Sequence, residues 1–353
     1  TNEKMAASST AADGREETPI TALHHDVLLA HVLSRLDGPA LAAASCASSL
    51  LHALISDDEG LWRGVCSATW PSTDHPRLRD VISGFPHGHR RFFSDSFPLL
   101  QSSWTEAHLC RAPPRPPTPT PSRLICAVDI RYEDRIVLSK VIETGTTSLG
   151  WFGSAPFRVD ALEAEEDSPF LPIPAGFSGA PGKSLTVSWI AVDPREKRAA
   201  NLSSGQAVWA APRRRWGSPW GGAGREDVEM RYSTVVPGGE GRGAEMVEVV
   251  VVVVVVVVAG CGEGARVREA SVTVEDMEGR KVSGEEGLRA VAAAMELGRR
   301  GAGGGGGCYY GEWMRLRAER RARNELVGWM LDMACMLVGF IVFFSCWCFI
   351  LHR

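Results

Sequence analysis

Histidine is the residue type in this sequence whose clustering could bind a metal ion. His24, His25 and His31 lie close together in the sequence, as do His87 and His89. Zinc sites combine histidine with cysteine or carboxylate ligands at short, regular spacings, and neither group has such partners at those spacings. We therefore interpret all five as surface histidines and expect no metal site.

Two further patterns approach catalytic motifs without completing them. The segment Gly176-Phe177-Ser178-Gly179-Ala180 approaches the nucleophile elbow of hydrolases, but it ends in alanine and lies in a loop rich in proline and glycine. The glycine run 303–307 has the spacing of a dinucleotide-binding loop, but no predicted strand precedes it. We predict no catalytic residues, no cofactor and a protein that is not an enzyme.

The overall composition narrows the possible partners and the compartment. Lys and Arg number 38 against 42 Asp and Glu, so the net charge of −4 argues against a nucleic-acid-binding protein. The nine cysteines are an odd number without a Cys-x-x-Cys pair, which is typical of a reducing compartment. Residues 1–18 are small and polar, lack the apolar core of a secretory signal and are predicted to be disordered.

A proline-rich segment divides the chain. Residues 111–122 contain six prolines and predict a stiff, extended linker. Before it, leucine, tryptophan and phenylalanine predict a helical module at 19–65 and a helical extension at 66–110. After it, residues 123–297 change to a β pattern. We expect few packed contacts across the linker.

The β-rich region mixes β-branched and aromatic residues in short runs between glycines and prolines. Strands are predicted at 124–133, 136–143, 185–193, 227–236 and 267–276. They favour an antiparallel sheet or sandwich, which makes the whole chain an α+β protein. Ten consecutive valines at 249–258 are too few to span a bilayer and are interpreted as a lengthened strand.

The helical module has a clear amphipathic start. Leu28, Val32 and Leu36 are spaced four residues apart, so they lie on one helix face. Asp37-Gly38-Pro39 ends this helix and begins a second one, rich in small residues, and a third short helix precedes Leu61-Trp62. Three short helices bury too little surface to be stable alone, so the module needs a partner.

The spacing of this module resembles the F-box motif. It is carried by L-x-x-D-x-L-x-x-x-x-L-x-x-L-D-x-x-x-L followed by D-D-x-x-L-W, although His24 stands where the family usually has proline. Segments 61–100, 189–204 and 267–281 are also similar to a plant F-box subfamily. The alternative is an unrelated helical hairpin.

The resemblance implies that the module binds the Skp-type adaptor of a cullin–RING ubiquitin ligase. The positions that match the adaptor-facing pattern of the family are Leu23, Asp26, Leu28, Leu33, Leu36, Leu41, Leu61 and Trp62. The β-rich region would then select the protein target.

The C-terminal part contains a short helix at 285–297, a glycine-rich spacer and basic helix within 298–326, and an apolar tail at 327–351. The tail has a single charge, Asp332, and predicts a transmembrane helix. Residues 299–323 carry seven arginines against two glutamates, so the positive-inside rule places the body in the cytosol. The alternative is a buried C-terminal helix of the β-rich region.

The sequence therefore predicts the substrate-recognition subunit of a cullin–RING ubiquitin ligase, held at a membrane by its tail. Its expected partners are the Skp-type adaptor, the cullin, an unknown protein target and the membrane, without nucleic acid. The alternative is a tail-anchored scaffold protein with no role in ubiquitination.

Overall fold

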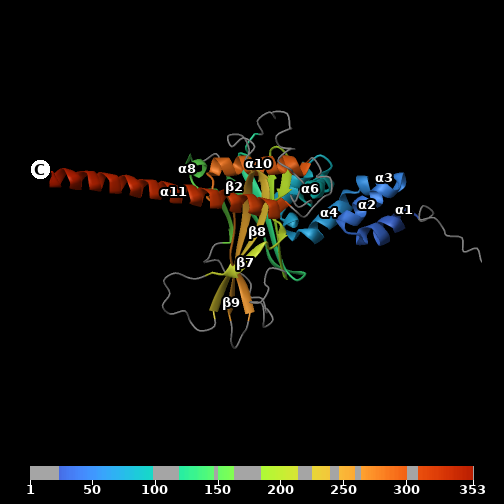
Figure 1. The fold of residues 1–353 in the computed structure, drawn as a ribbon. Helices are drawn as coiled ribbons and strands as arrows, with labels where there is room; N and C mark the ends of the chain where they lie inside the picture. Colours follow the sequence, from blue (N-terminus) through green and yellow to red (C-terminus); the bar gives the residue numbers. More distant parts are fainter. Residues whose placement is uncertain are drawn as a thin grey trace, which may run out of the picture. The chain divides into compact units, whose positions relative to one another are not determined.

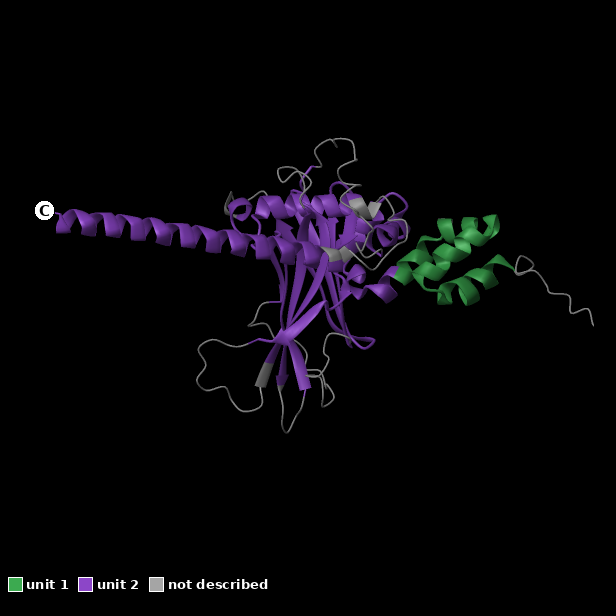
Figure 2. Ribbon diagram, viewed as in Figure 1, with its two compact units in different colours: residues 1–65 green, residues 66–353 purple. Residues whose placement is uncertain are grey.

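A computed structural model describes residues 24–97, 119–146, 150–162, 184–213, 225–238, 246–258, 264–299 and 309–352. The chain divides into two compact units, residues 1–65 and residues 66–353 (Figure 2). The predictions for residues 1–18, most of the proline-rich linker and most of the glycine-rich spacer lie outside the described residues.

The first unit is helical, as the sequence predicts. Its elements are α1 (His25–Val27), the π-helical η2 (Leu28–Val32), the 3-10 helix η3 (Leu33–Arg35), α2 (Gly38–Ala47), α3 (Ser49–Asp57) and the start of α4 (Glu59–Thr69). Side chains cap three of these helices. The Asp37 carboxylate accepts from the Ala40 N–H at 2.8 Å, the Ser48 hydroxyl from Leu50, and the Asp58 carboxylate from Leu61.

The first predicted helix is less regular than its apolar pattern suggests. A single amphipathic α-helix was expected from Leu28 to Leu36, but the backbone passes from an α turn into a π turn and a 3-10 turn. Leu36 then leaves the helix in an extended conformation, with φ −85° and ψ 144°. Asp37 follows as the cap of α2, so the stop signal read from the sequence is at the expected place.

The second unit contains a two-sheet β-sandwich (Figure 1). The first sheet has the order β2-β1-β4-β5, with β6 paired to β4, and the second has the order β3-β10-β9-β8-β7. The strands are β1 (Arg123–Tyr132), β2 (Arg135–Gly145), β3 (Arg158–Leu162), β4 (Leu185–Asp193), β5 (Arg198–Asn201), β6 (Gly205–Gln206), β7 (Trp209–Pro212), β8 (Arg225–Pro237), β9 (Met246–Val258) and β10 (Gly264–Glu275). The pairs between these strands are antiparallel.

The core lies between the two sheets. Phe157, Trp189 and Tyr232 are its largest fully buried side chains, and the Tyr232 hydroxyl donates to the Leu185 carbonyl at 3.1 Å. Burial raises the pKa of Tyr232, so this phenol keeps its proton and stays a donor. The predicted antiparallel sheet or sandwich is confirmed as a sandwich.

The valine run forms most of the central strand β9. It pairs with β8 on one side and β10 on the other. Alternate residues from Val247 to Val255 enter the sandwich core, while Val250, Val254 and Val256 are buried on the opposite face. The interpretation of the run as a lengthened strand is confirmed. Strands β8 and β10 pair with its two edges, so β9 is not an exposed edge strand.

Short helices cover the outer face of the first sheet. They are η4 (Pro71–Asp74), α5 (Pro76–Ser83) and α6 (Gly88–Ser96). The Asp129 carboxylate on β1 accepts from the Ser72 N–H at 3.0 Å and from the Ser72 hydroxyl. The Trp70 indole N–H donates to the Ser188 hydroxyl at 3.2 Å.

The helical extension therefore belongs to the same compact unit as the sheets, which differs from the division predicted at the proline-rich linker. The physical reason is visible in β1 and β4, where both faces are apolar. Ile125, Ala127, Ile190 and Val192 point away from the sandwich core and are fully buried. A sheet that is apolar on both faces needs a second covering layer, and residues 66–97 provide it.

Two helices complete the second unit. The helix α10 (Gly284–Arg299) packs Val291, Ala294 and Met295 into the core, and it confirms the short helix predicted at 285–297. It begins with a capping box, in which the Ser283 N–H donates to Glu286 at 3.2 Å and the Glu286 N–H to the Ser283 hydroxyl at 3.3 Å. The short helix α8 (Gly150–Ser154) lies against it.

The last helix, α11 (Tyr309–Leu351), is continuous over 43 residues (Figure 1). The predicted basic helix and apolar tail are therefore one element. Its base packs on the outer face of the second sheet, where Trp313 is only 2% exposed. From Leu326 onward the large apolar side chains are 40% to 70% exposed, so the tail is not a buried helix of the β-rich region. By length and composition, α11 is long and apolar enough to cross a membrane.

Candidate adaptor-binding and target-binding sites

Most of the predicted adaptor-facing residues form the core of the first unit. Leu28, Leu33, Leu41, Leu61 and Trp62 are all between 0% and 9% exposed. The Trp62 indole N–H donates to the Ile55 carbonyl at 2.8 Å, which ties α4 to the end of α3. Each of these positions therefore holds the helical module of residues 24–65, called the hook from here on, in shape, whatever it contributes to an adaptor.

The remaining predicted positions differ from that group. Asp26 is exposed, with its carboxylate 3.4 Å from the His24 ring, and Leu36 is half-buried. Leu23 lies outside the described residues. Asp26 and Leu36 are thus the described members of the predicted set that reach the surface.

A shallow groove of about 440 Å³ on the first unit was not predicted from the sequence. Its lining includes Leu29 of η2, Leu50 and Leu54 of α3, and Asp58 and Glu59, which follow α3 in the chain. Three half-buried leucines beside two carboxylates offer a partner an apolar patch with a charged rim, which is the anatomy of many protein interfaces. The available signal was Leu29, which extends the apolar stripe of the first helix beyond the face that the core needs.

His24 begins α1 in the place where the F-box pattern has proline. Its ring nitrogen accepts from the Asp26 N–H at 3.4 Å, and its backbone has φ −62° and ψ 141°. That φ is the value to which the proline ring is fixed. The local backbone of the motif is therefore retained although the proline is absent.

The whole chain can now be compared with known proteins. It is 36% identical to F-box protein At2g27310 of Arabidopsis thaliana over 95% of this chain and 97% of that protein. It is also 36% identical to F-box protein At3g44326 of the same plant over 92% and 90% of the two chains, and to probable F-box protein At2g36090 over 83% and 80%.

The chain belongs to the F-box protein family. No protein-family model matches it, and no solved structure matches it. The similarity covers most of the chain and most of each relative, so it extends beyond the hook of this plant F-box protein.

A larger groove of about 650 Å³ lies on the sandwich of this F-box protein, between β7, β8 and the base of α11. Three large apolar side chains on its walls are exposed: Val208 at 37%, Trp209 at 47% and Met314 at 43%. The Arg231 guanidinium lies 5.9 Å from the centre of the Trp209 ring, a cation–π contact that holds the indole in place. An exposed tryptophan fixed by an arginine is a frequent anchor in protein recognition.

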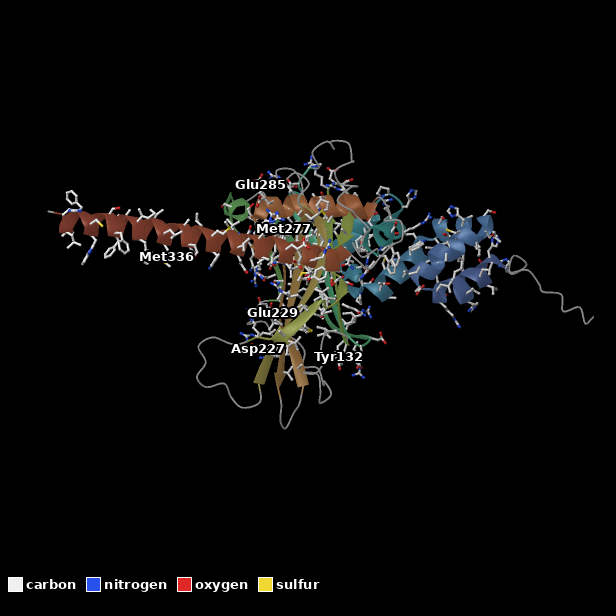
Figure 3. All side chains as sticks on the ribbon, viewed as in Figure 1. Tyr132, Asp227, Glu229, Met277, Glu285 and Met336 are labelled. Carbon is white, nitrogen blue, oxygen red and sulfur yellow. The ribbon has the colours of Figure 1, made fainter. Side chains whose placement is uncertain are left out.

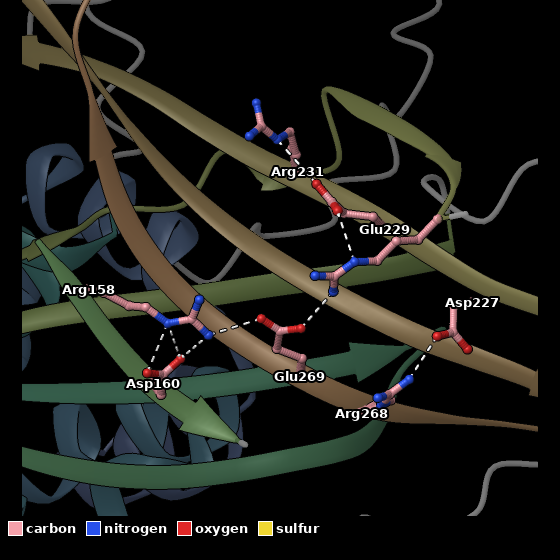
Figure 4. Close-up of polar contacts among 8 residues, drawn as sticks. Arg158, Asp160, Asp227, Glu229, Arg231, Arg268 and Glu269 are labelled. Carbon is pink, nitrogen blue, oxygen red and sulfur yellow. Dashed lines mark hydrogen bonds and ion pairs between the residues drawn. The ribbon is translucent and has the colours of Figure 1, made fainter. Parts of the chain in front are cut away.

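Glu229 and Arg231, which line that groove, are members of a series of ion pairs that extends across the second sheet (Figure 4). Arg158 contacts Asp160 and Glu269, and Arg213 joins Glu269 to Glu229. Arg231 continues the series from Glu229 to Glu275. Burial acts to raise the pKa of Glu269, but hydrogen bonds from Arg213 and Arg158 outweigh it and hold the pKa below its usual value.

The histidines do not form a metal site within the described part of the chain. There, no three His, Cys, Asp or Glu side chains are grouped as metal ligands. His24, His25, His31 and His87 are exposed as predicted, but His89 is buried at 4% exposure, so its interpretation as a surface residue is wrong. It lies on the inner face of α6, the face that also buries Phe92 and Phe93.

Proposed function

We propose that this F-box protein is the substrate-recognition subunit of an SCF-type cullin–RING E3 ubiquitin ligase and is anchored to a membrane by its tail. The observation that carries the proposal is the similarity to F-box proteins over nearly the whole chain. F-box proteins are adaptors that bring a target to a ligase whose other subunits carry the chemistry. In this reading the protein itself is not an enzyme.

Adaptor binding is assigned to the hook. Its surface groove of Leu29, Leu50 and Leu54, together with Leu36 and Asp26, would contact the Skp-type adaptor. The buried leucines and Trp62 would act through the shape of the hook. Leu23 stays a predicted contact.

Pull-down of adaptor and cullin with the full-length protein tests this assignment. Leu54→Asp places a charge in a surface that would lose its water on binding, which costs several kcal/mol when the charge is unpaired. The matched control is Ala43→Asp, at an exposed position of α2 away from the groove. Loss of both partners with Leu54→Asp alone is expected. Undiminished pull-down by a folded Leu54→Asp protein would contradict the assignment.

Target binding is assigned to the sandwich, with the groove around Trp209 as its anchor. Proximity labelling with the full-length protein, compared with Trp209→Ala, identifies proteins whose labelling depends on that side chain. Ile136→Ala on β2 is the control, because Ile136 is an exposed apolar residue of the other sheet. Proteins lost with Trp209→Ala but retained with Ile136→Ala are candidate targets, and identical labelling by all three would argue against this groove.

Membrane anchoring is assigned to the C-terminal part of α11. The apolar residues 327–351 form a helix about 37 Å long at 1.5 Å per residue, which fits the ~30 Å hydrocarbon core of a bilayer when the helix is tilted. We expect the full-length protein to resist carbonate extraction from membranes, and a protein ending at Asn324 to be released. Protease added outside sealed vesicles should digest the hook, because the arginine-rich side of the tail would face the cytosol.

The alternative function, a tail-anchored scaffold without a role in ubiquitination, predicts a different outcome. Such a protein would pellet with membranes but would recover neither adaptor nor cullin. The similarity to F-box proteins over nearly the whole chain favours the ligase function over the scaffold.

A further inference from the structure

A second hollow lies on the sandwich where α11 leaves it. It has a volume of about 340 Å³ and is lined by Met277, Glu278 and Arg280 from the turn after β10, and by Arg320, Arg321 and Asn324 from α11. In Figure 3 the labelled Met277 lies beside α11, and Met336 lies farther along the same helix. The Arg320 side chain pairs with Glu278 at 2.9 Å and joins the two walls.

The turn that carries Arg280 is rigidly built. The Asp276 carboxylate accepts from the Glu278 N–H at 3.0 Å and from the Arg280 N–H at 2.8 Å. Gly279 adopts φ +79°, a conformation that side chains rarely allow. The backbone of Arg280 is therefore fixed before any ligand arrives, which lowers the entropy that binding must overcome.

The side chains that line the hollow carry a net positive charge. Three arginines line it against two glutamates, Glu278 and Glu325, and Lys281 follows Arg280 in the chain. Arg320 is already paired with Glu278. Among the described residues, no carboxylate lies within ion-pair distance of Arg280, Lys281 or Arg321. Two guanidinium groups that face one hollow from different elements suit a phosphate, which accepts paired N–H donors.

The position of the hollow along α11 identifies the source of that phosphate. Arg321 is six residues before Val327, so it lies about 9 Å from the start of the apolar stretch along the helix axis. Head groups extend about 5 to 8 Å beyond the hydrocarbon core on each side, and an arginine side chain spans the remaining distance. Because α11 is one helix, the hollow is held at this depth whenever the tail spans a bilayer.

We propose that this hollow binds the head group of an anionic phospholipid, with Arg280 and Arg321 as the phosphate ligands. The proposal rests on the membrane anchor of the proposed function. Its consequence is that the sandwich is held against the bilayer through a lipid contact as well as through the covalent helix.

The test uses full-length protein inserted into nanodiscs of equal phosphatidylserine and phosphatidylcholine, followed by release and native mass spectrometry. The wild-type protein should retain phosphatidylserine in preference to phosphatidylcholine. Arg280→Gln and Arg321→Gln should each lower that preference about fivefold, which corresponds to the ~1 kcal/mol that one arginine contributes near an anionic surface. Both positions are exposed, so circular dichroism should report an unchanged fold.

The matched control is Arg323→Gln, which removes the same charge at nearly the same depth. Residue 323 is about 200° around the helix from residue 321 and does not line the hollow. The preference of the Arg323→Gln variant for phosphatidylserine should stay within a factor of two of that of the wild-type protein. An equal loss with Arg323→Gln would show diffuse attraction to the whole basic helix and would overturn the site.

Three other results would also overturn it. The first is no lipid preference in an inserted wild-type protein, which leaves the anchor and the ligase role intact. The second is full displacement of phosphatidylserine by inorganic phosphate, which would make the hollow a site for free phosphate. The third is failure of the protein to insert, which would also remove the membrane anchor from the proposed function.

Discussion

Replacing Arg317 should release the base of α11 from the sandwich. Arg317 contacts Glu248 on β9 and Glu275 on β10, at 3.3 Å for the second pair. The side chains of Glu248 and Glu275 are 2% and 6% exposed, so Arg317→Ala would leave two buried carboxylates with less compensation.

The magnitude follows from that burial. Removing one partner of a buried ion pair costs about 3–5 kcal/mol. Arg231 still pairs with Glu275, and the Tyr310 hydroxyl still contacts Glu248, so we expect a value near the lower end. Such a loss is a large fraction of the ~5–15 kcal/mol stability of a domain, and local undocking of α11 is an easier response than global unfolding.

Arg315→Ala is the matched control on the same helix. Arg315 is 65% exposed and pairs with Glu319 at 3.9 Å in an i, i+4 arrangement. Pairs of that kind contribute about 0.3–0.5 kcal/mol. The two variants remove the same charge from the same element and differ in burial.

Amide hydrogen exchange of the detergent-solubilised protein measures the result. Arg317→Ala should increase exchange in the first turns of α11 and in the part of β9 around Glu248, whereas Arg315→Ala should not. Equal protection in the two variants would refute the reasoning that Arg317 fixes the helix to the sheet.

Three further predictions concern the hook, the covering helices and the response to acid. His24→Pro should leave adaptor pull-down equal or stronger, because the φ of −62° already fits proline, and a clear loss would show that the helix start is misplaced. Asp129→Ala should lower the free energy of unfolding by about 1–3 kcal/mol, since it leaves the buried Ser72 N–H unpaired, and a denaturant melt that does not change would contradict that role. Glu269 has a lowered pKa when folded, so its contribution is complete above its unfolded pKa of about 4.3 and is lost as the pH falls through the lower folded value. Glu269→Gln should therefore flatten the acid side of a pH-dependent thermal melt.

The elements that could be predicted from the sequence are those whose signals are local. The cap at Asp37, the strand periods and the apolar tail each depend on neighbouring residues, and each is found where it was predicted. The order of the strands could not be predicted, because β3 pairs with the distant strand β10, where Leu162 lies opposite Ala270, 108 residues later in the chain. Contacts of that kind depend on the whole core.

The domain boundary predicted at the proline-rich segment differs from the observed boundary after residue 65, and the physical reason can be found in the sequence. The proline-rich segment stiffens a connection, but it does not decide whether the helices before it pack on the sheet after it. The segment LICAVDI in β1 is apolar almost throughout, whereas a sheet with one wet face alternates. Asp129 within it is buried because Ser72 and Ser139 donate to its carboxylate.

The predicted adaptor-binding set shows how a motif mixes two roles. A motif selects positions that cannot change, and a three-helix hook of this size has to fix its core as strictly as its contact surface. Leu28, Leu33 and Leu41 belong to the core, since their side chains are at most 2% exposed. Leu29 and Leu54 line the groove, where a leucine has no structural reason to stay apolar unless a partner covers it. Spacing alone cannot separate the two roles, because core and contact leucines alternate within one helical turn, and only the side-chain exposure in the folded hook tells them apart.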